Sequence, residues 1–432
     1  MKRTALVWLT TNLRLHDNPP LLTAIEQNDE VVPVYCLDSD HFKKTSAGFD
    51  KTGKFRARFI LEALSDLDAN LRAVGSGLVV VTGQPEVELC KIAEAYGANT
   101  VYTQSEFAGE ELITQEKVER ALTAIGCCLE KIASGDLYSD DDLPFTLENT
   151  PDIFTNYRKA VEQRCKVPEP VPAPTIITSP PIAPLQLPTL QQLGLEEFTI
   201  DVRQAFVFTG GETSGLQRVH EYLFESRSIL SYKQTRNGLT GSNYSSKFSA
   251  WLASGCISSR QVYQSIKNFE VDIAANESTY WLYFELLWRD YFRLVMKKYG
   301  TRLFHLSGIK QKITSLPVHN PALLKRWIQG ETGNDFIDAN MLELRNTGFM
   351  SNRGRQNVAS YFCHNLKLDW RLGASYFEQQ LIDYDVCSNW GNWAYVAGVG
   401  NDPRPNRYFN IDKQANDYDA DKSYRKLWIS VK

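Results

Sequence analysis

The chain has 432 residues, a formal net charge of −4 and 43% hydrophobic residues, which is typical of a soluble globular protein with two or more domains. No apolar run approaches the roughly 20 residues that a membrane-spanning helix needs. The N-terminus lacks the long apolar region of a signal peptide, so we expect a cytoplasmic protein. The eight cysteines show no Cys-x-x-Cys spacing and only three lie in the C-terminal half, so we expect no metal site.

The first 130 residues alternate between short apolar runs and helical patterns. Runs rich in valine, tyrosine and leucine predict strands at 5–9, 31–37, 78–81 and 100–102. Helical patterns lie between them, at 54–74, 86–96 and 110–125. Strands that alternate with helices predict a doubly wound parallel sheet, so we expect an α/β domain over 1–130. The usual Gly-x-Gly-x-x-Gly dinucleotide fingerprint does not follow any of these strands.

A proline-rich stretch divides the chain. Eight prolines lie between residues 168 and 188, and such a run forms neither helix nor central strand. We expect an interdomain connector over 131–200, and the restricted proline backbone favours a surface tether over a floppy hinge. Beyond it helical patterns dominate, and eight of the nine tryptophans fall between Trp251 and Trp428. Residues 201–432 are therefore predicted to form a mostly α-helical domain.

Two windows of the helical part, 291–330 and 344–368, contain basic residues and no acidic ones. Their bases are Arg293, Lys297, Lys298, Arg302, Lys310, Lys312, Lys325 and Arg326, followed by Arg345, Arg353, Arg355 and Lys367. A basic face attracts phosphates whatever the total charge of the protein. A solvated helix face gives the same pattern, so charge alone leaves nucleic-acid binding open.

Three segments of the helical part carry groups suited to a binding site. In 279–292, Glu285, Trp288 and Arg289 share one helical face, which suits a polar cavity with an aromatic wall or an ordinary Glu–Arg pair on a core helix. In 346–357, the amides of Asn352 and Gln356 lie one turn apart and suit the edge of a base or a pterin-like ring, although capping is the commoner role of such groups.

The third segment, 232–255, places serine hydroxyls and a lysine just before a predicted helix. Backbone N–H groups and the helix dipole can bind phosphate at such a point. The spacing of a P-loop is missing, and a serine-capped helix start is the alternative interpretation.

Together with 382–393, which reads Ile-Asp-Tyr-Asp-Val-Cys-Ser-Asn-Trp-Gly-Asn-Trp, these segments resemble the flavin domain of the photolyase–cryptochrome family, most closely its cryptochrome-DASH branch. The resemblance covers essentially the whole chain, including Thr-Asn-Leu-Arg-Leu-His-Asp-Asn at 11–18. It is densest at 346–356 and at 383–404, which ends in Gly-Val-Gly-Asn-Asp-Pro-Arg. It implies an α/β antenna-binding domain and an α-helical domain that binds FAD and the DNA lesion.

The resemblance implies FAD folded into a U inside the helical domain. The residues that match cofactor contacts are Tyr232, Ser245, Ser246, Lys247, Phe248, Ser249, Arg289, Arg355, Asp383, Asp385 and Asn389. Among them Asn389 matches the residue that faces flavin N5. A neutral amide there, in place of the aspartate of plant cryptochromes, does not repel an anionic reduced flavin and favours repair over signalling.

The implied reaction is the blue-light-driven splitting of cyclobutane pyrimidine dimers, in which one electron passes from excited reduced flavin to the dimer and returns. The matched lesion-binding residues are Glu285, Trp288, Asn352, Arg353, Gln356 and Tyr395, with Glu285, Asn352, Gln356 and Asn389 as the catalytic group. The histidine pair of (6-4) photolyases has no match near 356. Branch members prefer single-stranded DNA, which avoids the cost of extrusion from a duplex. RNA is a second candidate partner, and we expect a monomer.

Trp393 and Trp370 match the inner two members of the tryptophan chain that reduces the flavin. The third member is expected just before 320–327, where Leu316 and Pro317 stand instead. Either Trp327, Trp390 or a tyrosine completes the chain, or the terminal electron supply is impaired.

Glu106 matches an antenna-contacting carboxylate and implies methenyltetrahydrofolate as the second chromophore. The alternative function is a blue-light photoreceptor that repairs little, although the chain ends soon after Trp428, without the long tail that usually carries signalling. A third hypothesis is a flavin oxidoreductase that works without light, but no nicotinamide fingerprint supports it.

Overall fold

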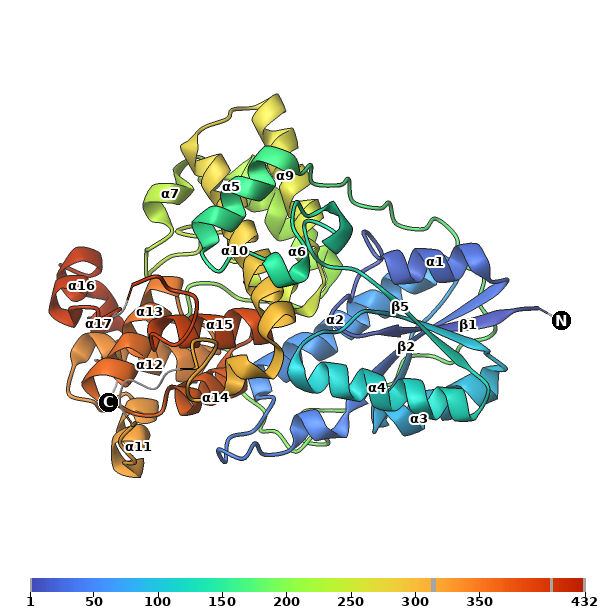
Figure 1. Ribbon diagram of the computed structural model, residues 1–432, viewed down its shortest axis with the longest axis horizontal. Helices are drawn as coiled ribbons and strands as arrows, with labels where there is room; N and C mark the ends of the chain where they lie inside the picture. The colour runs from blue at the N-terminus through green and yellow to red at the C-terminus, as the bar shows by residue number, and fades with distance from the viewer. Residues whose placement is uncertain (1, 312–315, 405–406, 430–432) are drawn as a thin grey trace.

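The computed structural model describes residues 2–311, 316–404 and 407–429. An α/β part, blue to cyan in Figure 1, lies beside a larger helical part that contains the C-terminal half of the chain. The α/β part is built on a parallel sheet of five strands in the order β3-β2-β1-β4-β5. The strands are β1 (Thr4–Leu9), β2 (Glu30–Asp38), β3 (Val79–Gly83), β4 (Thr100–Gln104) and β5 (Cys128–Ile132).

Helices cover both faces of this sheet because successive side chains of a buried strand point to opposite sides. The helices are α1 (Pro19–Gln27), α2 (Lys54–Ala73), α3 (Pro85–Tyr96) and α4 (Gly109–Ala124). In β1, Ala5 and Val7 belong to the apolar core that includes α1 and α2, whereas Leu6 and Trp8 pack with α3 and α4. Figure 1 shows α3 and α4 lying side by side. The predicted doubly wound α/β class is confirmed.

Sequence patterns missed the edge strand β5 and the short helix α1. The β5 segment, Cys-Leu-Glu-Lys-Ile, lies at one edge of the sheet, has no fully buried residue and carries two charges. It therefore lacks the apolar run that marks the inner strands. Helix α1 begins with two prolines and is capped by Asn18, which accepts a hydrogen bond from the N–H of Leu21.

The predicted connector, 131–200, contains a helix as well as the proline-rich stretch. Helix α5 (Phe154–Arg164) forms because Phe154, Tyr157 and Val161 make one apolar stripe that is buried against α10. The prolines then follow an extended path along the α/β part. There the N–H of Ile177 donates to the carbonyl of Val74 at 2.7 Å, and the N–H of Val31 donates to that of Thr178 at 2.9 Å. These bonds hold the stretch on the surface as a tether.

The remainder of the described chain is helical. Its α-helices are α6 (Glu212–His220), α7 (Tyr232–Thr235), α8 (Ser249–Ser254), α9 (Ser259–Asp272), α10 (Glu277–Tyr299), α11 (Pro321–Gln329), α12 (Asp335–Thr347), α13 (Asn352–Ser360), α14 (Trp370–Gln380), α15 (Val386–Val396), α16 (Ile411–Tyr418) and α17 (Ser423–Ile429). The long helix α10 packs against α15 and α7 and crosses the centre of this part (Figure 1). Among the helices described, none combines the length and apolar character needed to span a bilayer.

Candidate functional site

Two adjoining cavities, of about 290 Å³ and about 90 Å³, lie inside the helical part. Both are lined by Asn352, Arg355, Asp383 and Asp385, so these residues stand where the two meet. The residues from the sequence-predicted set that line the larger cavity are Tyr232, Ser245, Ser246, Lys247, Phe248, Ser249, Glu285, Trp288, Arg289, Asn352, Arg355, Asp383 and Asp385. Asn389, Gln356 and Trp393 line the smaller cavity. The fold thus brings segments from four parts of the sequence to one place.

Lys247 gives the larger cavity a basic group that has no hydrogen-bond partner among the described residues. Its side chain is only 2% exposed, its backbone is left-handed with φ 64°, and its Nζ has no hydrogen-bond partner in the described structure. The ammonium lies 3.1 Å from the ring centroid of Tyr244. Burial holds the pKa of Lys247 well below its usual range. A buried ammonium is costly without a counter-charge, so this position fits an anionic group such as a diphosphate.

Asp383 and Arg355 form the polar wall between the cavities. The Nη2 of Arg355 donates to Oδ2 of Asp383 at 2.8 Å, and the carboxylate is almost fully buried. The second oxygen, Oδ1, is also buried and has no partner among the described residues. Such an oxygen is an acceptor for an N–H donor. Lys247 thus marks a place for an anion, and Oδ1 of Asp383 marks a place for a ring N–H. FAD fits both, because it carries a diphosphate and a ring N–H.

Asn389 and Trp393 lie on consecutive turns of α15, next to the smaller cavity. The Nδ2 of Asn389 donates to the carbonyl of Ala374 at 3.0 Å, which fixes the orientation of the amide. The ring of Trp393 packs against α14 at Gly373. A Cβ atom at position 373 would lie 2.2 Å from Cη2 of Trp393. Trp370 is buried at the start of α14 and donates from Nε1 to the carbonyl of Leu306 at 3.1 Å.

Glu285 has a partner that sequence patterns did not predict. Its carboxylate forms an ion pair with Arg236, which follows α7 and lines the same cavity. Burial raises the pKa of Glu285, and the neighbouring guanidinium opposes that rise. Arg236 belongs to the segment 232–255 already singled out for its lysine and hydroxyls, but no spacing rule connects it to a glutamate 49 positions further on.

Trp288 does form an aromatic wall. Its ring stacks on Phe154 of α5, with centroids 3.7 Å apart and an angle of 11° between the planes. The ring of Tyr395 meets Trp288 edge-on at 6.0 Å. Tyr395 and Arg353 line neither of the two cavities, in contrast to the other matched lesion-binding residues. Arg353 instead donates to Oδ1 of Asn237 at 3.1 Å.

The two windows without acids are partly neutralised by acids from elsewhere in the chain. Arg293 and Lys297 pair with Asp136, and Lys298 pairs with Asp152 at 2.7 Å. Arg355 of the second window pairs with Asp383 in the same way. The predicted basic face is therefore smaller than the sequence suggested, because the connector supplies the missing acids. Lys312 of the first window lies outside the described residues.

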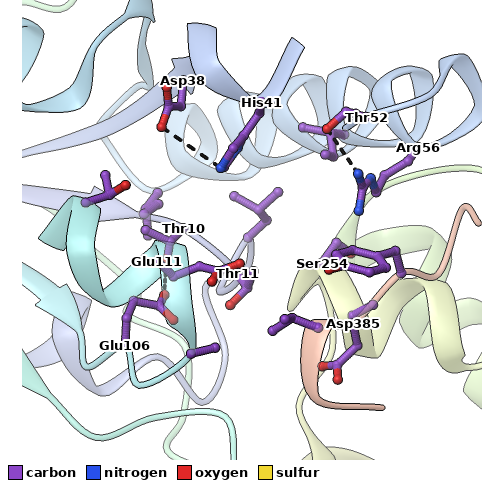
Figure 2. A pocket seen from close by; sticks show the side chains of 18 of the residues that line it. Thr10, Thr11, Asp38, His41, Thr52, Arg56, Glu106, Glu111, Ser254 and Asp385 are labelled. Atoms are coloured by element: carbon purple, nitrogen blue, oxygen red, sulfur yellow. Dashed lines mark hydrogen bonds and ion pairs between the residues drawn. The ribbon is translucent and has the colours of Figure 1, made fainter. Parts of the chain in front are cut away.

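A third cavity, of about 210 Å³, lies between the α/β part and the helical part. It opens at the carboxyl ends of the strands, where ligands of doubly wound sheets commonly bind. Figure 2 shows Glu106 and Glu111 on one side of it and Asp385 on the other. Glu106 accepts hydrogen bonds from Oγ1 of Thr10 at 2.9 Å and Nε2 of Gln104 at 3.1 Å. Burial raises the pKa of Glu106, and it raises the pKa of Glu111 to about 7.

Comparison with known proteins agrees with this architecture. Residues 5–175 match the family model of DNA photolyase, and residues 281–431 match that of the FAD binding domain of DNA photolyase. The chain is 47% identical to a cryptochrome DASH of Gloeobacter violaceus, over 99% of this chain and 85% of the relative. It is 45% identical to a cryptochrome DASH of Danio rerio, over 99% and 83%.

Solved structures give the same result. A cryptochrome of Synechocystis sp. superposes with a TM-score of 0.95 at 43% identity, over 99% of this chain and 89% of that one. A bacterial class III photolyase from Agrobacterium tumefaciens superposes with a TM-score of 0.84 at 26% identity, over 100% and 87%.

An α/β domain joined to a helical domain with this cavity defines a photolyase-type flavoprotein that binds FAD. The chain belongs to the photolyase–cryptochrome family, in its cryptochrome-DASH branch.

Proposed function

We propose that the protein uses blue light to repair cyclobutane pyrimidine dimers, preferentially in single-stranded DNA. The observation that supports this proposal is that two kinds of group line one cavity. Lys247 and Asp383 suit the flavin cofactor, whereas Glu285 and Asn352 suit the edges of extruded bases. A donor and an acceptor held in one cavity need no diffusion between them.

Reduced FAD, when bound, supplies the light-excited electron that opens the cyclobutane ring. The protein's own residues position the dimer and stabilise the charge that it transiently carries. In the proposed complex Glu285 and Asn352 donate to or accept from the base edges, and Gln356 extends this set. Burial raises the pKa of Glu285, and Arg236 opposes that rise. Its carboxylate can accept a hydrogen bond from a base N–H. Arg236 then releases Glu285 and takes a phosphate or a base oxygen as its new partner.

Two further residues shape the proposed reaction. Asn389 places a neutral amide at the smaller cavity, so that no carboxylate at this position opposes negative charge on the cofactor. Trp288, supported from behind by Phe154, offers a flat apolar surface on which a base can stack.

The preference for single strands has a physical reason. A dimer in a duplex has to be extruded before it can enter an internal cavity, and extrusion costs a few kcal/mol of unstacking. A single strand avoids that cost. Tyr395 and Arg353, which lie outside the two cavities, are proposed to contact the strand that flanks the lesion. RNA carrying the same lesion is a second substrate to be tested.

We also propose that the cavity of about 210 Å³ holds methenyltetrahydrofolate as an antenna, with Glu106 as a contact. Support comes from its position. Ala253 and Asp385 line both this cavity and the larger flavin cavity, so a chromophore here would be close enough to pass excitation energy to FAD.

The substrate role of Glu285 can be tested with FAD-loaded protein that has been chemically reduced. The wild type, illuminated with an oligonucleotide carrying one thymine dimer, is expected to restore the thymines. Glu285→Ala is expected to retain FAD and to lose most of this repair. Glu277→Ala, which removes an exposed glutamate at the start of the same helix, serves as the control. Loss of FAD from Glu285→Ala would place Glu285 in the cofactor site instead, and a wild type without repair would favour the photoreceptor.

A further inference from the structure

The outer end of the tryptophan chain is missing where it was expected. The sequence has no tryptophan between Trp288 and Trp327, and Leu316 stands there 78% exposed. Two other indoles contact the inner pair. The ring of Trp327 lies 6.2 Å from that of Trp393, and the ring of Trp390 lies 5.8 Å from that of Trp370. Either of them is near enough to pass an electron inward.

Trp327 is poorly suited to be the terminal donor. Its side chain is 0% exposed, packed among Phe362, Phe377 and Tyr376, and its Nε1 has no partner in the described structure. An indole that loses an electron becomes a strong acid, and none of the described residues accepts a hydrogen bond from this N–H. The positive charge on an oxidised Trp327 could be neither neutralised by proton loss nor removed by a reductant in solvent. Trp327 would therefore take an electron back from the inner pair, Trp393 and Trp370.

Trp390, in contrast to Trp327, has a hydrogen-bond acceptor for its indole N–H. It is half-buried, and its Nε1 donates to the hydroxyl oxygen of Tyr384 at 3.2 Å. The hydroxyl of Tyr384 in turn interacts with the carboxylate of Glu378 on α14. Burial raises the pKa of Glu378, which makes this carboxylate a better proton acceptor. Tyr384 and Glu378 both line the cavity between the two parts of the protein, so in FAD-loaded protein without the antenna the relay ends at a space that a small molecule can enter.

We propose that Trp390 and Tyr384 form the outer end of the electron chain, with Glu378 as the proton acceptor; this inference rests on the flavin photochemistry proposed above. Oxidised Trp370 takes one electron from Trp390. Trp390 then takes one electron from Tyr384, whose phenolic proton moves to Glu378. A thiolate in solution reduces the resulting tyrosyl radical, and the proton returns from Glu378 to the phenol oxygen. The thiyl radicals pair to give a disulfide.

The relay is tested by illuminating oxidised, FAD-loaded protein with a thiol and by freezing samples for electron paramagnetic resonance. The wild type is expected to give a tyrosyl signal. Tyr384→Phe is expected to lose it and to show an indole signal instead, and Trp390→Phe is expected to slow the accumulation of reduced flavin severalfold. Glu378→Gln is expected to remove the slowing that the wild type shows in heavy water. FAD content and the unfolding midpoint of each variant report whether it folds.

Trp327→Phe is the matched control, because it removes the rival indole and is expected to leave both the signal and the accumulation as in the wild type. The proposal is overturned if Trp327→Phe slows photoreduction severalfold while Trp390→Phe does not, or if the tyrosyl signal survives Tyr384→Phe. Dithionite-reduced wild type needs no relay, so its failure to repair dimers would count against the proposed function and not against these residues.

Discussion

Two buried atoms that have no partner among the described residues characterise the proposed flavin site at the scale of single residues. Nζ of Lys247 and Oδ1 of Asp383 line the same cavity, one positive and one negative. An unsatisfied buried charge destabilises a folded protein unless a ligand compensates it. The groups that hold FAD are therefore expected to weaken the cofactor-free protein, and this can be measured separately from light-driven chemistry.

Lys247→Met keeps the length and volume of the side chain and removes its charge. Hydrogen bonds to charged groups contribute about 1.5–3 kcal/mol, so the affinity for FAD is expected to fall on the order of tenfold to a hundredfold. The FAD-free protein is expected to be at least as stable as the wild type. Isothermal titration and urea unfolding measure the two effects. Lys267→Met, at an ion pair on the surface of α9, is the control, and unchanged FAD affinity in Lys247→Met would contradict the assignment.

Glu343 is buried near Lys247 and Arg355 and gives the protein a pH dependence. Burial raises its pKa from 4.5 to about 7, and the groups that face it are Tyr424, Lys247 and Arg355. The folded state therefore binds more protons than the unfolded state between these values, so stability is lost as pH rises through that window. The loss is on the order of 3 kcal/mol at about 1.4 kcal/mol per unit.

Urea unfolding of the wild type and of Glu343→Gln between pH 5 and 8 tests whether stability falls as pH rises. The wild type is expected to lose stability toward pH 8, and the variant is expected to lose less because glutamine does not ionise. Part of the dependence is expected to remain, since burial raises the pKa of Glu111 and Asp290 to about 7 as well. Equal slopes in the two proteins would show that Glu343 does not titrate in this range.

At the scale of elements, the connector orients the helix that carries the site. Helix α10 presents Glu285, Trp288 and Arg289 to the cavity, and one to two turns later Arg293 and Lys297 pair with Asp136. The backbone N–H of Leu137 also donates to Asp290 of this helix at 2.7 Å. These contacts fix the rotation of α10, and with it the direction in which Glu285 points.

Asp136→Ala is expected to destabilise the protein by about 3–5 kcal/mol, because it leaves Arg293 buried without its counter-charge. Asp152→Ala removes an exposed partner of Lys298 and is expected to change stability by less than about 1 kcal/mol. Thermal unfolding of both variants measures the difference. Similar values for the two would mean that the Asp136 pair is as weak as a surface one.

Patterns local in sequence predicted the elements well and their contacts poorly. The strands 5–9, 31–37, 78–81 and 100–102 were visible because each is a short run rich in valine, tyrosine and leucine, whereas strand β5 carries two charges and was not visible. The matched cofactor residues line one pair of cavities, and this could be predicted only because a family resemblance supplied the tertiary arrangement. The pairs Arg236–Glu285 and Asp136–Arg293 join segments far apart in the chain, and no local periodicity encodes them.

At the scale of the whole molecule, a common wall joins the larger cavity of the helical part and the cavity proposed for the antenna. Glu106→Ala is expected to weaken folate binding and to leave FAD content unchanged. Of the three cavities described above, Glu106 lines only the one of about 210 Å³ between the two parts of the protein. Fluorescence excitation spectra of flavin measure energy transfer from the folate. Glu110→Ala, which removes a more exposed carboxylate nearby, is the control. Full energy transfer in Glu106→Ala would place the antenna elsewhere.

Light-driven repair by the reduced, FAD-loaded protein is the decisive measurement for the proposed function. Matched single-stranded and duplex oligonucleotides, each with one thymine dimer, would be illuminated beside dark samples, and restored thymines counted. We expect repair only in the light, with binding of the duplex weaker by about tenfold or more because extrusion costs a few kcal/mol. Absence of repair on both substrates, with FAD bound and reduced, would contradict the account and leave the photoreceptor as the function to be tested.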